Sequence, residues 1–123
     1  MPKRVLIAED SSVIQNLTKK ILLQLDYSID TVKNGLAVLK KIELADYDII
    51  LMDINMPKMD GMACAKAIRE LDDTTKSSIP IVAITGNAKN YTEIDFEEVG
   101  INEYLEKPIN FDELVTVVKK YTE

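Results

Sequence analysis

The sequence contains no histidine and no tryptophan, and it has one cysteine, Cys64, among its 123 residues. Without histidine the chain can build neither an imidazole metal site nor a histidine general base. A lone cysteine excludes an internal disulfide framework, and its place in a helical pattern favours a small buried side chain over a redox group. We therefore expect a protein of the reducing cytoplasm.

Long apolar runs and clusters of positive charge are also missing. No stretch approaches the ~18 consecutive apolar residues of a membrane span, and the N-terminus lacks the apolar region of a signal peptide. The 15 Lys and Arg residues are outnumbered by 21 Asp and Glu residues, which gives a net charge of -6. Without an apolar span we expect no association with a membrane. Because the negative field repels phosphate backbones, we also expect no direct binding to nucleic acid.

A regular alternation of strand and helix patterns fills the chain, whose length suits one domain spanning residues 1–123. Several strand runs are continuously apolar, which is typical of strands buried on both faces. The pattern therefore predicts an α/β fold with a doubly wound, five-stranded parallel sheet and five helices on its two faces. The predicted strands are Arg4 to Ala8, Ser28 to Val32, Ile49 to Met52, Ile81 to Ile84 and Glu103 to Leu105.

Apolar residues at helical spacing predict the helices. The first helix begins at a capping box of Ser12 and Gln15, and the last at a similar pair, Asn110 and Glu113. The apolar residues of the first helix are Val13, Ile14, Leu17, Ile21, Leu22 and Leu25. The remaining expectations are helices over Leu36 to Leu44, Gly61 to Leu71 and, in poor register, Ala88 to Val99, and a polar loop over Asp72 to Pro80.

Polar side chains follow four of the predicted strands. Glu9 and Asp10 come directly after the first strand, and Asp53 ends the apolar run of the third. Thr85 follows the fourth strand and Lys107 the fifth. Because the ligand crevice of a doubly wound sheet lies beyond the carboxyl ends of its strands, we expect these residues to share one edge.

Carboxylates gathered at one edge raise each other's pKa unless a cation neutralises them. Mg²⁺ suits such a site, since it prefers oxygen ligands and needs neither histidine nor cysteine. Asp10 and Asp53 are the expected carboxylate ligands, with Glu9 acting directly or through water. The backbone carbonyl of Asn55 is a further candidate ligand that no sequence pattern supports.

A carboxylate can also act as a nucleophile on phosphorus and form an aspartyl phosphate. Asp53 is the predicted nucleophile, Lys107 would supply an opposing positive charge, and the Thr85 hydroxyl could donate to a phosphoryl oxygen. Each residue taken alone also fits a structural role, as a turn residue or a solvated loop charge, and Asp60 before Gly61 fits a helix cap better than a metal ligand. The ordered combination of these residues favours phosphoryl transfer over separate structural roles.

The chain resembles the receiver domains of two-component response regulators along essentially its whole length. The ordered marks that carry the resemblance are Glu9-Asp10, Asp53, Met56-Pro57-Lys58-Met59-Asp60-Gly61, Thr85 and Lys107-Pro108. The resemblance implies a flavodoxin-like sheet with strand order 2-1-3-4-5. It also implies that Asp53 accepts a phosphoryl group from a phosphohistidine on a histidine kinase or phosphotransfer protein, with Mg²⁺ held by Glu9, Asp10, Asp53 and the Asn55 carbonyl.

The resemblance further implies a conformational switch. In the family, the Thr85 hydroxyl moves toward the phosphoryl group and the Tyr104 ring turns inward, which remodels the face made by the fourth helix, fifth strand and fifth helix. Such a change is a population shift between two existing arrangements. The family also implies a cis bond between Lys107 and Pro108, and a monomer or a dimer that forms on phosphorylation.

Two features depart from or extend the family pattern. Gly86 stands where the family usually has alanine, which predicts a more mobile loop, and Asn55 and Asn87 occupy positions that tune the phosphoryl lifetime. The fourth predicted helix is unusually acidic, and its charges form either a solvated face or an output surface for a basic partner. Its acids are Glu93, Asp95, Glu97 and Glu98.

Other functions remain open at this point. A phosphatase of the haloacid dehalogenase type also uses a strand-end aspartate with magnesium, but it typically has a second acid two residues later, where this chain has Asn55. An inert receiver-like docking domain would bind its partner regardless of phosphorylation. We favour a phosphoaccepting signalling domain that catalyses only its own phosphotransfer and dephosphorylation, either alone or as part of a larger protein such as a hybrid kinase.

Overall fold

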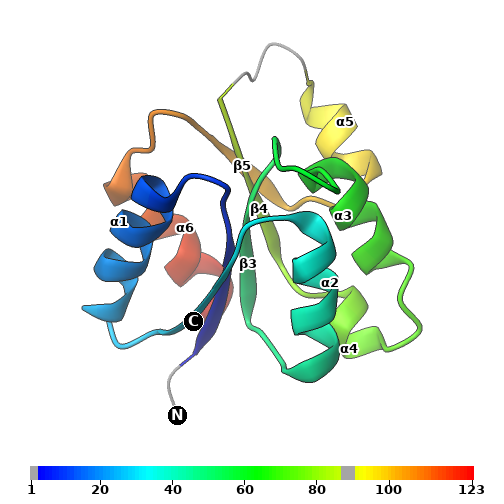
Figure 1. The fold of residues 1–123 in the computed structure, drawn as a ribbon, viewed down its shortest axis with the longest axis horizontal. Helices are drawn as coiled ribbons and strands as arrows, with labels where there is room; N and C mark the ends of the chain where they lie inside the picture. The colour runs from blue at the N-terminus through cyan, green and yellow to red at the C-terminus, as the bar shows by residue number, and fades with distance from the viewer. Residues whose placement is uncertain (1–2, 87–90) are drawn as a thin grey trace.

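The computed structural model describes residues 3–86 and 91–123, and it contains one parallel sheet (Figure 1). Neighbouring strands follow the order β2-β1-β3-β4-β5. This order and the α/β class confirm the predicted fold. The strands are β1 (Arg4–Ala8), β2 (Ser28–Val32), β3 (Ile49–Asp53), β4 (Ile81–Thr85) and β5 (Glu103–Glu106).

The described residues form six helices rather than the predicted five. The additional one, α4, lies in the segment expected to be a loop, where the Asp73 carboxylate accepts the N–H groups of Thr75 and Lys76 and starts a single turn. None of these helices is long and apolar enough to cross a membrane. They are α1 (Ser12–Leu23), α2 (Gly35–Leu44), α3 (Gly61–Arg69), α4 (Thr74–Ser77), α5 (Glu93–Glu98) and α6 (Phe111–Thr122).

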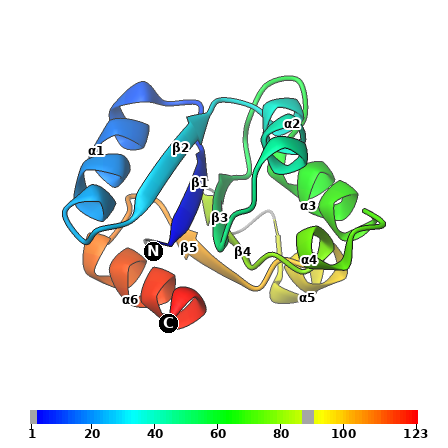
Figure 2. The same cartoon turned by 90° about the horizontal axis from the view of Figure 1, so that it is seen from below.

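The sheet is covered on both faces, as Figure 2 shows from below: α1 and α6 lie on one side, and α2, α3 and α5 on the other. Successive strand residues point to opposite faces. Val5 and Ile7 therefore pack in the core beneath α1 and α6, while Leu6 and Ala8 pack in the core beneath the other helices. This double burial explains why the interior strands are continuously apolar.

The start of α1 differs from the prediction. Ser11, not Ser12, is the N-cap, and its hydroxyl accepts the N–H of Ile14. The Gln15 amide is buried and donates to two backbone carbonyls, Glu9 O at 3.2 Å and Val32 O at 3.0 Å. The predicted Ser12 and Gln15 capping box is therefore wrong, because Gln15 joins the ends of β1 and β2 instead.

The outward face of α1 is more apolar than predicted. Leu22 is fully buried, but Val13 is 69% exposed and Leu17 is 47% exposed. Polar Gln15 and Thr18 take buried positions, because their side chains bond to backbone carbonyls. The helix thus leaves apolar side chains in solvent.

The fourth predicted helix is shorter in the described residues than the sequence indicated. It begins at Glu93 after a capping box, in which Thr92 accepts the N–H of Asp95 and the Asp95 carboxylate accepts the N–H of Thr92. Asn87 and Ala88 lie outside the described residues, so the expectations for them are untested. At the start of α6, Asn110 is the N-cap as predicted and accepts the N–H groups of Asp112 and Glu113. The return bond from the Glu113 side chain is absent from the described residues, so only the Asn110 half of the predicted capping pair is confirmed.

Two glycines near the carboxyl edge of the sheet give opposite predictions for alanine. A Cβ on Gly61 would lie 2.7 Å from Asp53 O and 2.9 Å from Ile54 Cα, so we expect Gly61→Ala to lower the free energy of unfolding by about 1 to 3 kcal/mol. A Cβ on Gly86 would meet only Lys107 Cδ, at 3.7 Å, in a backbone outside the left-handed region. Gly86→Ala should therefore stabilise by about 0.4 to 1 kcal/mol through the unfolded state.

Urea unfolding followed by circular dichroism measures both variants, each serving as the control for the other. Equal destabilisation by the two alanines would contradict the close approach of Gly61 to the end of β3.

Candidate functional site

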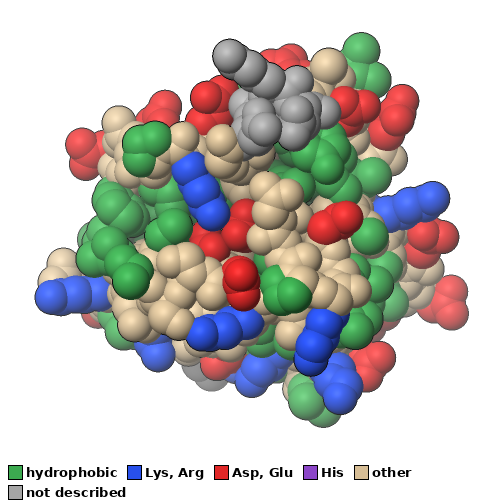
Figure 3. Space-filling view, turned by 45° about the horizontal axis from the view of Figure 1, so that its top comes forward, with side chains coloured by type: hydrophobic (Ala, Val, Ile, Leu, Met, Phe, Trp, Pro, Cys, Tyr) green, Lys and Arg blue, Asp and Glu red, His purple; other side chains and the backbone are tan. Residues whose placement is uncertain are grey.

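The carboxyl ends of β1, β3, β4 and β5 bring the predicted residues to one edge of the sheet. The register explains this, because Ala8 pairs with Met52, Asp53 with Ile84, and Thr85 with Glu106. Glu9 follows β1 directly, and Lys107 follows β5. Figure 3 looks toward this edge, where acidic and basic side chains lie close together near the middle of the face.

Glu9 and Asp53 form a buried pair of carboxylates beside one ammonium group. Their residues are 2% and 3% exposed. Lys107 Nζ lies 3.2 Å from Glu9 Oε1 and 3.3 Å from Asp53 Oδ2. With both acids ionised, one negative charge is left uncompensated in a buried place, and this is costly.

Backbone groups hold the other oxygen of each carboxylate. The Ser11 N–H donates to Glu9 Oε2 at 3.1 Å, and the Asn55 N–H donates to Asp53 Oδ1 at 3.2 Å. Glu9 Oε1, although near the ammonium, has no hydrogen bond within the described part of the chain. Burial raises the pKa of the Glu9 carboxyl and the adjacent Asp53 raises it further, while Ser11 N–H and Lys107 act in the opposite direction.

Asp10 is exposed, unlike the two buried acids. Across residues 3–86 and 91–123, no group of three or more acidic or cysteine side chains lies close enough to hold a metal ion together. The structure thus brings Glu9 and Asp53 together but does not bring the Asp10 carboxylate into their pair. The donor chemistry still suits a hard divalent cation, since it consists of oxygen, carries excess negative charge and includes the unbonded Glu9 Oε1.

Thr85 and Lys107 are tied to each other through the backbone. The Lys107 N–H donates to Thr85 O at 2.8 Å, and Thr85 is 1% exposed at the end of β4. The bond between Lys107 and Pro108 is cis, which confirms that part of the resemblance. The Lys107 side chain is thereby placed at the end of the sheet, over the two carboxylates.

Tyr104 belongs to an aromatic contact that the sequence did not reveal. Its ring stacks on Phe96 of α5, with ring centroids 4.9 Å apart, and Phe96 also contacts Tyr91 at 5.8 Å. Phe96 is buried and links β5 to α5. The available signal was that Phe96 is the one aromatic residue of a helix whose other residues are four acids and Ile94.

The loop between β3 and α3 supports the site but adds no carboxylate to the pair of Glu9 and Asp53. Asp60 Oδ1 accepts the Ala63 N–H at 2.8 Å, so the cap interpretation of Asp60 is confirmed. Cys64 is buried as predicted, its thiol donates to Gly35 O, and burial raises the pKa of the thiol to about 12. These groups stabilise the loop and α3 rather than react.

Similarity to known proteins extends over nearly the whole chain. A family model described as the response regulator receiver domain matches residues 5–119. Transcription factor SKN7 of Saccharomyces cerevisiae is 35% identical, over 95% of this chain and 18% of that protein. Hybrid signal transduction histidine kinase I of Dictyostelium discoideum is 36% identical, over 100% of this chain and 8% of that protein. The chain therefore corresponds to a small part of each relative.

Solved structures give the same result. One similar structure is the receiver domain of a sensor histidine kinase from Pseudomonas aeruginosa, which has a magnesium ion coordinated in its active site cleft. It is 30% identical with a TM-score of 0.89, and the match covers 99% of this chain and 98% of that one. Chemotaxis response regulator CheY4 of Vibrio cholerae has a TM-score of 0.88 and 27% identity, covering 98% and 99%. The sheet order, the residues at its carboxyl edge and these similarities show that the chain belongs to the response regulator receiver domain family of two-component systems.

Proposed function

We propose that this receiver domain is a phosphoryl-accepting switch, in which Asp53 takes a phosphoryl group from a phosphohistidine on a histidine kinase or phosphotransfer protein. One observation carries the proposal: Asp53 is buried at a strand end beside a second carboxylate, with one ammonium between them. A structural role needs no such pair. A cytoplasmic location and action as one domain over residues 1–123 are parts of the proposal.

In the transfer, an Asp53 carboxylate oxygen bonds to phosphorus while the bond from phosphorus to the donor imidazole nitrogen breaks. The Asn55 N–H orients Asp53 through Oδ1, and Lys107 lies beside Oδ2, where it offsets negative charge on the arriving group. Thr85, at the neighbouring strand end, supplies a hydroxyl for a phosphoryl oxygen. These residues act by positioning and charge, which is what phosphoryl transfer mainly requires.

Glu9, Asp10, Asp53 and the Asn55 carbonyl would hold Mg²⁺. A bound divalent cation neutralises phosphoryl charge that Lys107 alone does not offset. The excess negative charge and the unbonded Glu9 Oε1 support this assignment, as does the magnesium ion in the Pseudomonas aeruginosa neighbour. The exposed Asp10 would join the other ligands by rotation of its side chain.

The output side of the switch is the face formed by α5, β5 and α6. Thr85 ends β4, Tyr104 lies in the adjacent β5, and the Tyr104 ring stacks on Phe96 of α5. We expect a shift of the Thr85 side chain toward a phosphoryl group to reach α5 through Tyr104 and Phe96. This accounts for a signalling role without turnover of an external substrate.

Asp53 phosphorylation is tested with Mg²⁺ and either acetyl phosphate or beryllofluoride. With acetyl phosphate we expect the intact mass to increase by one phosphoryl group, and with either reagent we expect amide NMR shifts that spread from Asp53 to Thr85, Tyr104 and α5. Asp53→Asn should abolish both effects, whereas Asp60→Asn, which alters an exposed capping acid of the same loop, should retain them. An unchanged mass and spectrum with donor in excess would contradict the switch.

The buried Glu9 predicts an unusual dependence of stability on pH. Because its folded pKa is raised above 4.5, Glu9 contributes stability below about pH 4.5 and loses that contribution as the pH rises through the folded pKa. In EDTA, Glu9→Gln should therefore have a higher urea midpoint than the natural protein at pH 7.5, and a similar midpoint at pH 4.

Magnesium should reverse this order at pH 7.5. The natural protein gains about 2.7 kcal/mol at a Mg²⁺ concentration 100 times the Kd, while Glu9→Gln loses a ligand and gains less. A Glu9→Gln protein that is less stable in EDTA, or equally stabilised by Mg²⁺, would count against the roles given to Glu9.

The exposed apolar residues of α1 are expected to meet the phosphodonor protein. The helix begins two residues after Asp10. A donor protein whose histidine reaches Asp53 must therefore also lie against the exposed side chains near the start of α1. Replacing Val13 and Leu17 with alanine should slow transfer from a phosphorylated donor protein about tenfold, equivalent to ~1.4 kcal/mol, without changing the rate with acetyl phosphate. Leu44→Ala, at an 83% exposed position at the other end of the sheet, is the control. Equal slowing with both donors would place the effect in the chemistry instead.

A further inference from the structure

The buried amide of Gln15 joins the first turn of α1 to the ends of two strands. Gln15 is 8% exposed, and its Nε2 atom donates to Glu9 O at 3.2 Å and to Val32 O at 3.0 Å. A side-chain amide nitrogen carries two hydrogens, so both donors of this group are used. The strands joined in this way are β1 and β2, against which α1 packs (Figure 2).

The same turn of α1 holds Glu9 by its backbone and by its side chain. The Glu9 N–H donates to Val32 O at 3.0 Å, and the Glu9 carbonyl accepts the Gln15 amide, so both polar backbone groups of Glu9 are bonded. At the side chain, Glu9 Oε2 accepts the Ser11 N–H at 3.1 Å. The Ser11 carbonyl in turn accepts the backbone N–H of Gln15 at 3.0 Å, which closes a ring of hydrogen bonds around Glu9.

This ring determines where the free oxygen of Glu9 lies. A glutamate side chain has one more rotatable bond than an aspartate, so it loses more conformational freedom when it is fixed at an ion. In the structure Glu9 Oε1 lies 3.2 Å from Lys107 Nζ and has no hydrogen bond within the described residues. The oxygen that could accept a cation is therefore presented by groups that do not themselves contact the cation.

Thr18, the other buried polar residue of α1 in the described chain, forms a purely local contact. It is 1% exposed, and its hydroxyl donates to Ile14 O at 2.8 Å, within the same helix. Gln15 instead directs both donors out of the helix, to the residue that carries the carboxylate and to the neighbouring strand. The two side chains offer a matched comparison, because each forms buried hydrogen bonds from α1 but only Gln15 reaches Glu9.

We propose that Gln15 is a positioning residue for the divalent cation, because it fixes the backbone of Glu9 and so holds the Glu9 carboxylate ready to act as a ligand. Groups that support a metal ligand from behind commonly change metal affinity about tenfold or more when they are lost. Gln15 acts through Glu9 and not on the reacting atoms. The inference rests on the proposed function, which makes Glu9 a ligand of Mg²⁺.

Magnesium titrations followed by amide NMR compare Gln15→Met with Thr18→Val. Gln15→Met keeps a side chain of similar size but removes both amide donors, and Thr18→Val removes a buried hydroxyl from the same helix. We expect the Kd for Mg²⁺ to rise about tenfold in Gln15→Met and to change less than about twofold in Thr18→Val. A natural Kd in Gln15→Met, or equal weakening in the two variants, would overturn the proposal.

Gln15→Asn provides the same test if the methionine variant does not fold. Its amide sits on a side chain one methylene shorter, so it can keep one of the two hydrogen bonds and lose the other. We expect the Kd for Mg²⁺ to rise about threefold, less than in Gln15→Met. A Kd equal to that of the natural protein would overturn the proposal.

Hydrogen exchange in EDTA tests the positioning of Glu9 without a metal. The Ser11 N–H, which donates to Glu9 Oε2, should exchange roughly fivefold faster in Gln15→Met than in the natural protein. The Asn55 N–H, which donates to Asp53 Oδ1, should keep its rate. An unchanged rate at Ser11, or an equal increase at both amides, would overturn a role specific to Glu9.

Phosphorylation by acetyl phosphate separates this inference from the proposed function. Gln15→Met should need about tenfold more Mg²⁺ for half its maximal rate and should come within about twofold of the natural rate when Mg²⁺ saturates. A lower maximal rate with an unchanged Mg²⁺ requirement would overturn the role of Gln15 and leave the phosphorylation of Asp53 supported. A natural protein that takes no phosphoryl group at Asp53 would overturn the proposed function, and the role of Gln15 with it.

Discussion

The sharing of one ammonium group by two buried carboxylates is the interaction on which the rest of the site depends. Lys107 stands between Glu9 and Asp53, so the pair carries more negative charge than its one cation offsets. The fold is arranged to hold this unfavourable combination: three strands end at the same edge, and backbone N–H groups of Ser11 and Asn55 fix the carboxylate orientations. An arrangement that lowers stability in this way is typical of a site that receives a charged group.

The constellation at the sheet edge could be predicted because it follows from local patterns and one topological rule. Asp53 directly ends an apolar run, and parallel strands present their carboxyl ends together. The cap of α1 could not be predicted, because its position depends on where the chain leaves β1, and the Glu9 N–H is bonded to Val32 O on another strand. Helical spacing likewise identifies the apolar residues Val13 and Leu17 but not which side of the helix meets the sheet.

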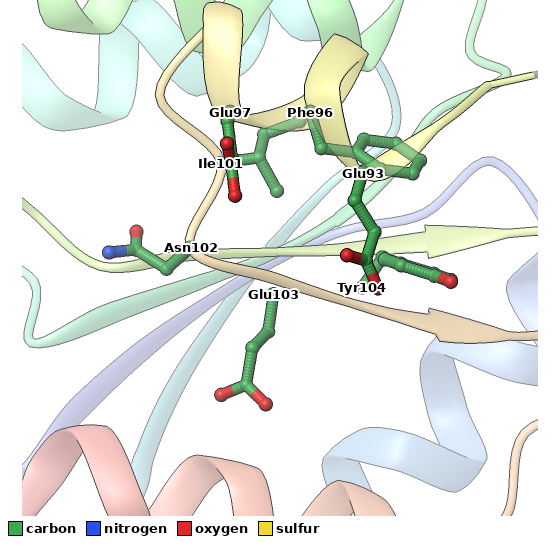
Figure 4. Close-up of a pocket in the computed structure, with 7 residues that line it drawn as sticks. All are labelled: Glu93, Phe96, Glu97, Ile101, Asn102, Glu103 and Tyr104. Atoms are coloured by element: carbon green, nitrogen blue, oxygen red, sulfur yellow. The ribbon is translucent and has the colours of Figure 1, made fainter.

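The acidic helix α5 shows a second limit of sequence reasoning. A solvated face and a partner surface were both open, and the structure divides the acids between distinct positions. Asp95 completes a capping box, Glu93 and Glu97 line a hollow between α5 and β5 (Figure 4), and Glu98 is exposed outside it. The contact between Phe96 and Tyr104 was hidden because it joins residues of different elements, and no periodicity in one element reports on such a pair.

Arg69 holds the chain in place at the C-terminal end of α5. Its guanidinium bonds to Gly100 O and Asn102 Oδ1 just beyond the C-terminal end of the helix, and to carbonyls before β4, so that end is a fixed pivot. A Cβ at Gly100, whose φ is +82°, would meet the Arg69 side chain at 2.6 Å, so the pivot also requires glycine. If the proposed switch moves α5 through its contact at Phe96, Glu93 is expected to move farther than Glu97, because Glu93 lies farther from this fixed end.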